Sequence, residues 1–449
     1  MATFDLLIRG GTVVNHDGRG AADVGVRDGV VVAIGDLGGA DAGEVLDATG
    51  LHVLPGVIDT QVHFREPGPT HKENLESGSR GAVLGGVTGV FEMPNTNPTT
   101  STPEMLQDKL DRAAGRGGEG NSGAMHCHHA FYVGGTHANA DHLHELERLP
   151  GCCGVKVFMG ASTGDLLIAD DEGVSRVLNS IRRRASFHSE DEYRLEERRK
   201  LARSGDWTSH PEVRDAEAAL LSTQRLIRLA REARKRIHIL HISTKDELPV
   251  LAANRDIASC EVTPQHLTLS APVAYEEMRG RAQMNPPIRT ESHRLGLWQG
   301  VRSGLFDVVG SDHAPHTPEE KAKPYPLSPS GMPGVQTLVP IMLDWVHQGA
   351  LTLERFVDLT SHGANRVWGI AGKGRLAVGY DADITVVDLR KEHMLADAEQ
   401  ANRSGWTPYH GRTVTGMPTH TIIDGKIVMA EGEVVMEGQG RPYRFTECL

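Results

Sequence analysis

The stretch Val57-Ile-Asp-Thr-Gln-Val-His-Phe-Arg-Glu-Pro-Gly68 decides how the fold of this chain is interpreted. A mostly apolar run over residues 51–58 passes abruptly into polar residues. Side chains alternate along a strand, so Gln61, His63 and Arg65 share one face. The pattern predicts a buried strand whose C-terminal end opens into a polar site. That site would offer an amide, an imidazole and a guanidinium.

Length and composition narrow the class of protein. The chain has 449 residues, enough for one large domain with a smaller accessory one. Its net charge of -12 argues against a nucleic-acid or anionic-membrane partner. No apolar run approaches the roughly 18 residues of a membrane helix, and the N-terminus lacks the basic region of a signal peptide. The 5 cysteines do not form a disulfide framework. We expect a cytoplasmic, globular protein.

Both ends of the chain are β-rich. Short strands separated by turns are expected at Phe4–Arg9, Gly11–Asn15, Ala22–Arg27 and Val30–Ile34. The same alternation of short strands and turns is expected at 382–388, 418–423 and 426–429. This predicts one small β-sandwich domain formed by residues 1–55 and 371–449, on either side of a central domain over 56–370.

The centre of the chain alternates strands with helices. Strands are expected at Leu54–Ile58, Thr88–Glu92, His126–Val133, Gly154–Met159, Ala185–Ser189, Ile237–Ile242, Ala258–Val262 and Phe306–Gly310. The clearest helical spacing between them covers Ala216–Ala233. Eight such units favour an α/β fold of the (β/α)8 TIM-barrel type. A doubly wound open sheet is the alternative, but no Gly-x-Gly-x-x-Gly follows an early strand, which weakens its dinucleotide-binding version.

Residues able to bind metal or move protons recur at the ends of these strands. They are Gln61, His63, Lys156, His188, His241 and Asp312. In a barrel the C-terminal ends of the strands converge on one mouth, so these side chains would meet there. Imidazole and carboxylate ligands suit zinc, which lowers the pKa of bound water. Asp312 would then be placed to accept a proton.

Lys156 is unusual because an inward-facing lysine is costly to bury while charged. It needs an anionic partner, a lowered pKa or a chemical modification. Carboxylation by carbon dioxide would turn it into an anionic oxygen ligand able to bridge two metals.

Other polar stretches receive structural interpretations. His126, His128 and His129 are expected to pack within a strand, and His137, His142 and His144 to lie on a surface helix. The mixed-charge segment Glu190 to Arg203 is expected to be solvated. Residues 324–334, rich in Pro, Ser and Gly, are expected to form a loop over the barrel mouth.

Several motifs resemble the amidohydrolase superfamily and, within it, the class I dihydroorotases. They include Leu54-Pro-Gly-Val-Ile-Asp59, His63-Phe-Arg-Glu-Pro-Gly68, Glu92-Met-Pro-Asn-Thr-Asn-Pro98, Met284-Asn-Pro-Pro-Ile-Arg289 and Asp312-His-Ala-Pro-His316. The resemblance implies a barrel with a terminal β-sandwich, and reversible hydrolysis of dihydroorotate in pyrimidine biosynthesis. It also implies a homodimer or an association with aspartate carbamoyltransferase.

The same resemblance implies roles for individual residues. Zinc ligands would be His63, carboxylated Lys156, His188, His241 and Asp312, with Asp312 also the catalytic acid and base. Contacts to the substrate would come from Arg65, Asn95, Asn285, His316, Ser330 and Gly331.

One position departs from the family pattern. Where the family has His-x-His, this chain has Gln61-Val62-His63. A glutamine amide is a weaker zinc ligand than imidazole. Gln61 could ligate weakly, water could replace it, one metal could suffice, or activity could be lost. We expect an active enzyme with one firmly bound Zn²⁺ and a weaker or absent second ion.

Two competing functions stay open at this level. One is a different cyclic amidase, such as a hydantoinase or allantoinase. The other is a non-catalytic scaffold related to dihydroorotase, because loss of a metal histidine is typical of such proteins.

Overall fold

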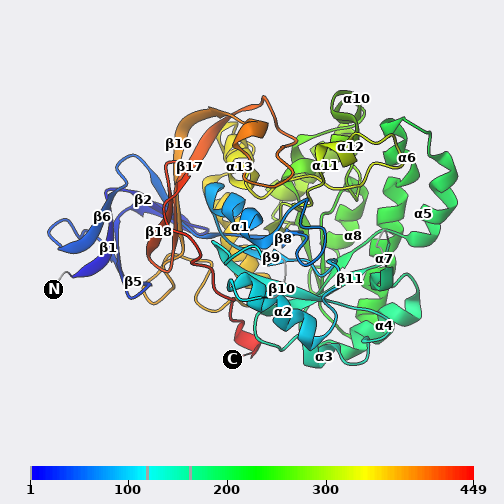
Figure 1. Ribbon diagram of the computed structural model, residues 1–449, viewed down its shortest axis with the longest axis horizontal. Coiled ribbons are helices and arrows are strands. Elements are labelled where there is room, and N and C mark those ends of the chain that lie inside the picture. The colour runs from blue at the N-terminus through cyan, green and yellow to red at the C-terminus, as the bar shows by residue number, and fades with distance from the viewer. Residues whose placement is uncertain (1–2, 118–120, 161–163, 449) are drawn as a thin grey trace.

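Eight parallel strands in chain order form the central sheet of the computed structural model (Figure 1), which describes residues 3–117, 121–160 and 164–448. They are β8 (Val57–Val62), β9 (Val87–Glu92), β10 (His128–Gly134), β11 (Cys152–Phe158), β12 (Ala185–His188), β13 (Ile237–Ile239), β14 (Ala258–Val262) and β15 (Val308–Val309). The sheet closes where the His63 N–H donates to the His313 carbonyl at 2.7 Å. Residues just after β8 and β15 are thereby neighbours.

Every residue of these eight strands is buried. A parallel sheet covered on both faces requires near-continuous apolar runs rather than alternation. Valine, isoleucine and phenylalanine supply those runs here. The (β/α)8 barrel predicted from the sequence is confirmed.

Helices follow most of the barrel strands and pack around the sheet (Figure 1). They are α1 (Leu75–Leu84), α2 (Pro103–Ala113), α3 (Leu143–Leu146), α4 (Asp171–Ser180), α5 (Glu192–Arg198), α6 (His210–Val213), α7 (Ala216–Ala233), α8 (Leu248–Ala252), α9 (Pro264–Thr268), α10 (Val273–Met278), α11 (Glu291–Arg302), α12 (Pro318–Lys321), α13 (Leu338–His347), α14 (Leu353–Val357) and α15 (Gly363–Trp368). Helix α7 has the predicted limits, because Asp215 caps its first turn and Arg234 leaves it in a left-handed conformation. Within the described ranges, no helix combines the length and the apolar character needed to cross a membrane.

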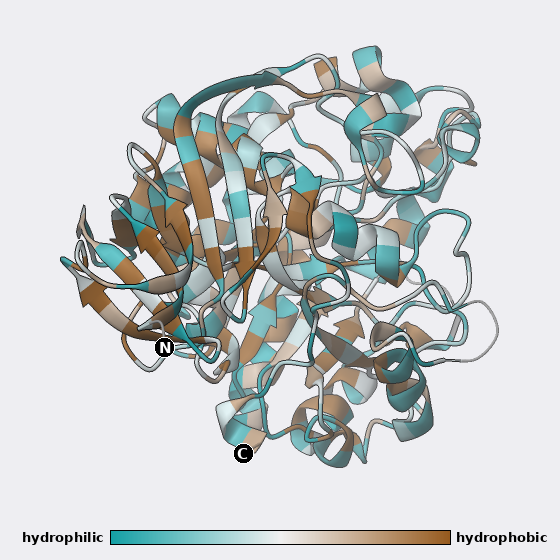
Figure 2. Cartoon of the chain, turned by 60° about the vertical axis from the view of Figure 1, so that its left-hand side comes forward, coloured by the Kyte–Doolittle hydropathy of each residue, from teal (hydrophilic) through white to brown (hydrophobic). Residues whose placement is uncertain are grey.

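Two further sheets are built from the ends of the chain. One contains β1 (Phe4–Arg9), β4 (Asp23–Arg27), β5 (Val30–Gly35) and β6 (Ala42–Asp47). The other contains β2 (Thr12–Asn15), β3 (Gly18–Ala21), β7 (His52–Pro55), β16 (Ile384–Met394), β17 (Thr413–Ile423), β18 (Lys426–Ala430) and β19 (Glu433–Val434). Hydrophobic bands run along the strands in Figure 2. Residues from both ends share a core that includes Leu6, Val24, Val53, Ile384 and Ile422, which confirms the predicted β domain.

The first barrel strand begins later than the sequence suggested. Residues 54–58 were expected to form one strand, but the chain leaves β7 at Pro55 and enters β8 at Val57. Gly56 is the joint, and a Cβ there would overlap Thr88 and approach the Cβ of Asp383 to 2.9 Å. The apolar run is long enough to serve two sheets in succession, which is why it could not be divided from sequence.

The C-terminal segment returns to the end of the barrel at which the strands begin. Pro442 pairs with His129 and Phe445 with Ile370. Tyr443 and Phe445 pack around Phe91, with ring centroids 5.8 and 5.9 Å from its own. This end of the barrel is therefore covered by the last residues of the chain.

The packing of this segment predicts that Gly89→Ala destabilises the protein. A Cβ on Gly89 would overlap the Tyr443 hydroxyl, and overpacking of a core costs about 1–3 kcal/mol. The midpoint of thermal or denaturant unfolding should fall accordingly. Gly20→Ala is the matched control, since a Cβ there meets nothing within 4 Å. Equal stability of the two variants would contradict the proposed close approach.

Candidate active site at the barrel mouth

A cavity of about 100 Å³ lies at the C-terminal ends of the barrel strands. It is lined by Gln61, His63, Arg65, Asn95, Lys156, Phe158, His188, His241, Asn285, Asp312, Ala314, Ser330 and Gly331. These include all the residues singled out from the sequence except His316. The ring of His316 lies directly behind Arg65, with Nε2 3.3 Å from Arg65 Nη2. Phe158 and Ala314 were not predicted.

Asp312 is the meeting point of the first and last strands. Gln61 Nε2 donates to Asp312 Oδ1 at 2.9 Å, and His63 Nε2 lies 3.2 Å from the same oxygen. Asp312 adopts a φ of 46° and His241 a φ of 37°. Such backbone angles are uncommon for non-glycine residues and cluster at functional sites.

The tautomer of His63 follows from its other contact. His63 Nδ1–H donates to Asn95 Oδ1 at 2.7 Å, so Nε2 carries a lone pair in the neutral ring. Burial lowers the pKa of His63 although Asp312 opposes the shift. Two electron-pair donors, His63 Nε2 and Asp312 Oδ1, therefore face the same point.

His188 and His241 form a second group of donors. His188 Nε2–H donates to Glu190 Oε2 at 2.8 Å, which leaves the Nδ1 lone pair facing His241 Nε2 at 3.0 Å. Burial lowers the pKa of both imidazoles. The two rings are thus neutral and present nitrogen atoms toward each other across a short gap.

Glu190 corrects an expectation from the sequence. It was assigned to a solvated charged segment, but it is fully buried. Burial alone would raise the pKa of Glu190, yet Arg214 and His188 hold that pKa well below its usual value. The carboxylate of Glu190 bonds to Arg214 and His188 in place of water. Its contact with His188 orients that imidazole. The assignment was wrong because the pairing with Arg214 depends on the fold.

Lys156 has 1% of its surface exposed and points into the cavity. Burial lowers its pKa to about 7, while the more distant Asp312 and Glu261 act in the opposite direction. Its ammonium has no carboxylate within 4.0 Å in the described part of the chain. Of the three possibilities left open by the sequence, an anionic partner is not supplied by the described residues, which leaves a lowered pKa or a chemical modification.

The donor set fits a divalent metal ion of the zinc type. Neutral imidazoles and a carboxylate are ligands that zinc prefers. Gln61 Oε1, His241 Nδ1 and Asn285 Oδ1 are buried without a hydrogen-bond partner among the described residues. Buried polar atoms normally have hydrogen-bond partners, so these three atoms are available to contact a bound ligand. The residues fall into two groups, Gln61, His63 and Asp312 on one side and Lys156, His188 and His241 on the other.

A second His and Asp cluster lies away from the mouth. His128, Asp383 and Asp424 place ligand atoms within 4.8 Å of one another. Lys373 and Arg441 already pair with the two carboxylates. Burial disfavours a charged His128, but the carboxylates outweigh it and raise its pKa. We interpret the cluster as an ion-pair network that connects the barrel to the terminal sheet. His128 is packed in β10 as expected.

Arg65 is a buried cation that lacks a counter-charge. It has a φ of 63°, donates from Nε to the Pro315 carbonyl at 3.3 Å, and has 9% of its surface exposed. His316 Nε2–H is directed to the Ser330 carbonyl at 3.0 Å, so it does not accept from Arg65. No carboxylate of a described residue lies within 4.0 Å of the guanidinium. Its remaining N–H groups are free to bind an anion in the cavity.

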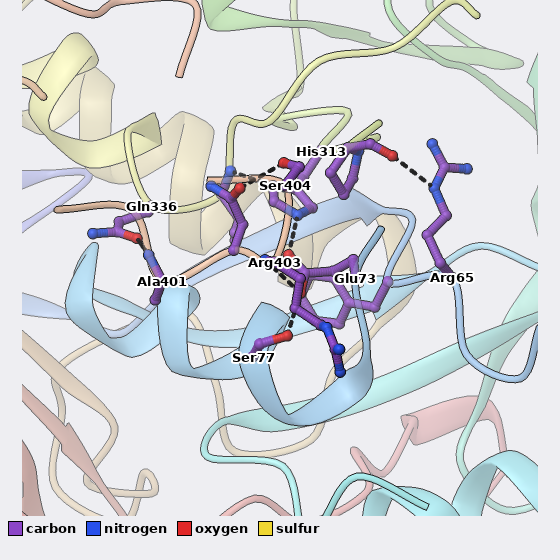
Figure 3. Close-up of polar contacts among 12 residues, drawn as sticks. Arg65, Glu73, Ser77, His313, Gln336, Ala401, Arg403 and Ser404 are labelled. Carbon is purple, nitrogen blue, oxygen red and sulfur yellow. Dashed lines mark hydrogen bonds and ion pairs between the residues drawn. The ribbon is translucent and has the colours of Figure 1, made fainter. Parts of the chain in front are cut away.

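Two supports of the site were not predicted from the sequence. His313 Nε2 lies 3.3 Å from the buried carboxylate of Glu73 (Figure 3). The Nδ1 of His313 accepts from the Gly334 N–H at 3.1 Å. Trp406 Nε1 donates to the His316 carbonyl at 2.8 Å. Trp406 comes from the β16–β17 connection, so the terminal domain reaches over the mouth. No local signal links a tryptophan to a histidine so distant in the chain.

The chain is similar to known proteins in both sequence and fold. Residues 52–428 match the Amidohydrolase family, and the chain belongs to that family. A dihydroorotase from Methanosarcina acetivorans is 32% identical, covering 97% of this chain and 96% of that one. An allantoinase from Rubrobacter xylanophilus is 36% identical over 99% and 98% of the two chains. The solved L-hydantoinase (dihydropyrimidinase) from Arthrobacter aurescens superposes with a TM-score of 0.91 at 28% identity, covering 98% and 99%.

The contact between His188 and Glu190 predicts that Glu190→Gln weakens zinc binding about 10–100-fold, the usual effect of losing a carboxylate that orients a ligating imidazole. Competition with a chromophoric chelator would measure the affinity. Glu196→Gln on the exposed side of α5 is the matched control. Unchanged affinity in Glu190→Gln would show that His188 is not a ligand oriented in this way.

Proposed function

We propose that this protein is a dihydroorotase. It would interconvert (S)-dihydroorotate and N-carbamoyl-L-aspartate by metal-dependent, reversible hydrolysis of a cyclic amide, as a step of pyrimidine biosynthesis in the cytoplasm. The observation that carries the proposal is Arg65, a buried guanidinium without a carboxylate partner that faces the cavity. A substrate carboxylate would supply the missing charge. Relatives named dihydroorotase and relatives named allantoinase are both 32–36% identical, so the choice between these activities depends on Arg65.

The substrate chemistry argues against the other cyclic amidases. Hydantoin, dihydrouracil and allantoin are ring amides without a carboxylate group. A site built for them would leave Arg65 unpaired in a buried setting, which is costly. A non-catalytic scaffold is also disfavoured, since Lys156, His188, His241 and Asp312 all line one cavity.

In this proposal the substrate is held from two sides. Arg65, Asn95 and His316 bind its carboxylate. Asn285, whose Oδ1 has no partner among the described residues, and the Ser330–Gly331 segment contact the ring. The Gly331 N–H donates to the Gln283 carbonyl at 2.9 Å, and a Cβ at this position would overlap the Ala314 carbonyl. The segment is therefore fixed close to the cavity.

Two sets of residues would hold metal. Lys156, in its carboxylated form, His188 and His241 would hold the firmly bound Zn²⁺, and His63 and Asp312, with the weaker Gln61, would hold any second ion. When bound, zinc supplies a water of lowered pKa and polarises the carbonyl. Asp312 would move the proton to and from the ring nitrogen. Gln61 Nε2 donates to its Oδ1, which orients the carboxylate for this role.

Removal of the guanidinium should impair substrate binding most. Arg65→Met is expected to lower kcat/KM for dihydroorotate about 10–100-fold, chiefly through KM, because a charge-assisted pair worth about 1.5–3 kcal/mol is lost. Steady-state assays in both directions would measure this, with exposed Arg148→Met as the control.

A parallel substrate panel completes that test. Wild-type protein should turn over dihydroorotate in preference to dihydrouracil, hydantoin and allantoin. If allantoin or hydantoin were preferred, or if Arg65→Met changed kcat alone, the proposed substrate would be wrong. If none reacted with the zinc- or manganese-loaded protein, the scaffold function would replace it.

The two sets of ligands also predict the metal content. After dialysis the wild-type protein should retain about one zinc ion per chain, because a glutamine amide is a poor zinc ligand. Gln61→His should raise the content toward two, and Lys156→Ala should lose the firmly held ion. Elemental analysis would measure all three. Two tightly held ions in the wild type would contradict the role given to Gln61.

A further inference from the structure

A second cavity lies at the opposite end of the barrel from the mouth. Its volume is about 100 Å³, and it is lined by Cys153, Arg183, Arg184, Arg236, Arg366, Val367, Trp368, Gly369 and Glu447. We call it the arginine cavity. Arg183 and Arg184 directly precede β12, and Arg236 directly precedes β13. The candidate active-site residues His188 and His241 stand at or just beyond the other ends of these same two strands.

The charge in the arginine cavity is opposite to that of the whole chain. Four arginines and a single acidic side chain, Glu447, are found among its described lining residues, whereas the chain carries a net charge of -12. Glu447 lies 3.8 Å from Arg183 Nε and is itself half exposed. Arg366 pairs with Asp358 at 2.8 Å and lies 3.8 Å from Asp307. The positive charge that the described residues leave without a paired carboxylate is therefore that of Arg184 and Arg236.

The guanidiniums of Arg184 and Arg236 have no carboxylate within 4.0 Å in the described part of the chain. Arg184 uses Nη1 to donate to the Ile237 carbonyl at 2.9 Å and to Ser259 Oγ at 2.8 Å, which fixes its fork in place. Burial, and then the like charge of Arg236, lower the pKa of Arg184 to about 10. Holding two like charges together at a half-buried site is unfavourable unless an anion joins them.

An aromatic side chain forms part of the wall of the arginine cavity. Trp368 is one of its lining residues and is only 4% exposed. Trp368 is held in place by Phe91, whose ring centroid lies 5.3 Å away at 87°. The wall of the cavity is therefore fixed by packing within the barrel end.

We propose that the arginine cavity binds an oxyanion of the phosphate class, either free or as the phosphate group of a small phosphomonoester. Planar guanidinium groups match the oxygen atoms of phosphate. A cavity needs about 10–15 Å³ to hold a single water molecule, and the arginine cavity, at about 100 Å³, is several times larger. The arginine cavity thus has room for one oxyanion with a few waters, and the remainder of a phosphomonoester would extend into solvent past Arg236.

Bound phosphate would join parts of the chain that are distant in sequence. The lining residues come from the starts of β12 and β13, from the end of α15 and from the C-terminal segment. An anion that binds this folded arrangement and not the unfolded chain raises stability with its concentration. The site therefore links phosphate concentration to the stability of the barrel end that the C-terminal segment covers.

Titration calorimetry and thermal unfolding of the purified full-length protein would test the site. The titrants are inorganic phosphate and glycerol phosphate at constant ionic strength, with chloride as the blank. The wild type should bind one equivalent and melt at a higher temperature. Arg236→Gln should weaken binding about tenfold, the value of one charge-assisted hydrogen bond. Because Arg236 is exposed and has no ion-pair partner among the described residues, this variant should fold normally.

Three further variants separate the possible explanations. Glu447→Gln should tighten phosphate binding by removing the competing carboxylate. Arg234→Gln, exposed and not part of the lining, should change nothing. Arg65→Met should leave phosphate binding intact, since it alters only the mouth. Absence of binding by both titrants, equal affinity in Arg236→Gln, or loss of binding in Arg65→Met would each overturn the proposal.

Discussion

Closure of the barrel between β8 and the segment after β15 is the constraint on which the candidate site depends. The His63 N–H donates to the His313 carbonyl at 2.7 Å, and the Ser311 N–H donates to the buried carboxylate of Asp59 at 2.9 Å. Burial raises the pKa of Asp59 to about 7, while the hydrogen bonds from Ser311 and Gln61 oppose the rise. These bonds place residues from the two ends of the sheet side by side. Without them His63 and Asp312 would not face a common point.

The mouth avoids buried charge mainly by neutralising its titratable groups. Imidazoles with lowered pKa values carry little charge at neutral pH, and a lysine whose pKa is about 7 is only partly charged. Arg65 is charged and has no carboxylate of a described residue within 4.0 Å, and this is the basis of the proposed substrate carboxylate. The opposite end of the barrel instead gathers arginines around a small cavity. The two ends of the barrel thus each contain cationic side chains without a paired carboxylate. We propose that the mouth binds metal and a ring amide and that the arginine cavity binds an oxyanion.

The terminal domain contributes to the site as well as to stability. Trp406, from the connection between β16 and β17, supports the carbonyl of His316. The segment at Ala401 and Arg403 contacts Gln336 and Glu73, and Glu73 in turn pairs with His313 (Figure 3). The ion pairs of Asp383 and Asp424 with His128, Lys373 and Arg441 tie the same domain to β10. Barrel and terminal sheets therefore form one continuous structure around the mouth.

Local patterns in the sequence were sufficient to predict the barrel, the limits of α7 and the polar residues at the strand ends that gather at the mouth. Asn95, Asn285 and the Ser330–Gly331 segment were predicted only through the resemblance of motifs to a known family. They succeed because strand periodicity, helix capping and polar residues at strand ends are properties of neighbouring residues. The tertiary structure alone decided that Gly56 divides one apolar run between two sheets. It also decided that Glu190 is buried beside Arg214, and that Trp406 supports His316. It brought Arg184 and Arg236 together with Trp368 in one cavity. Each of these outcomes depends on burial and on contacts between distant segments, which exist only once the chain has closed on itself.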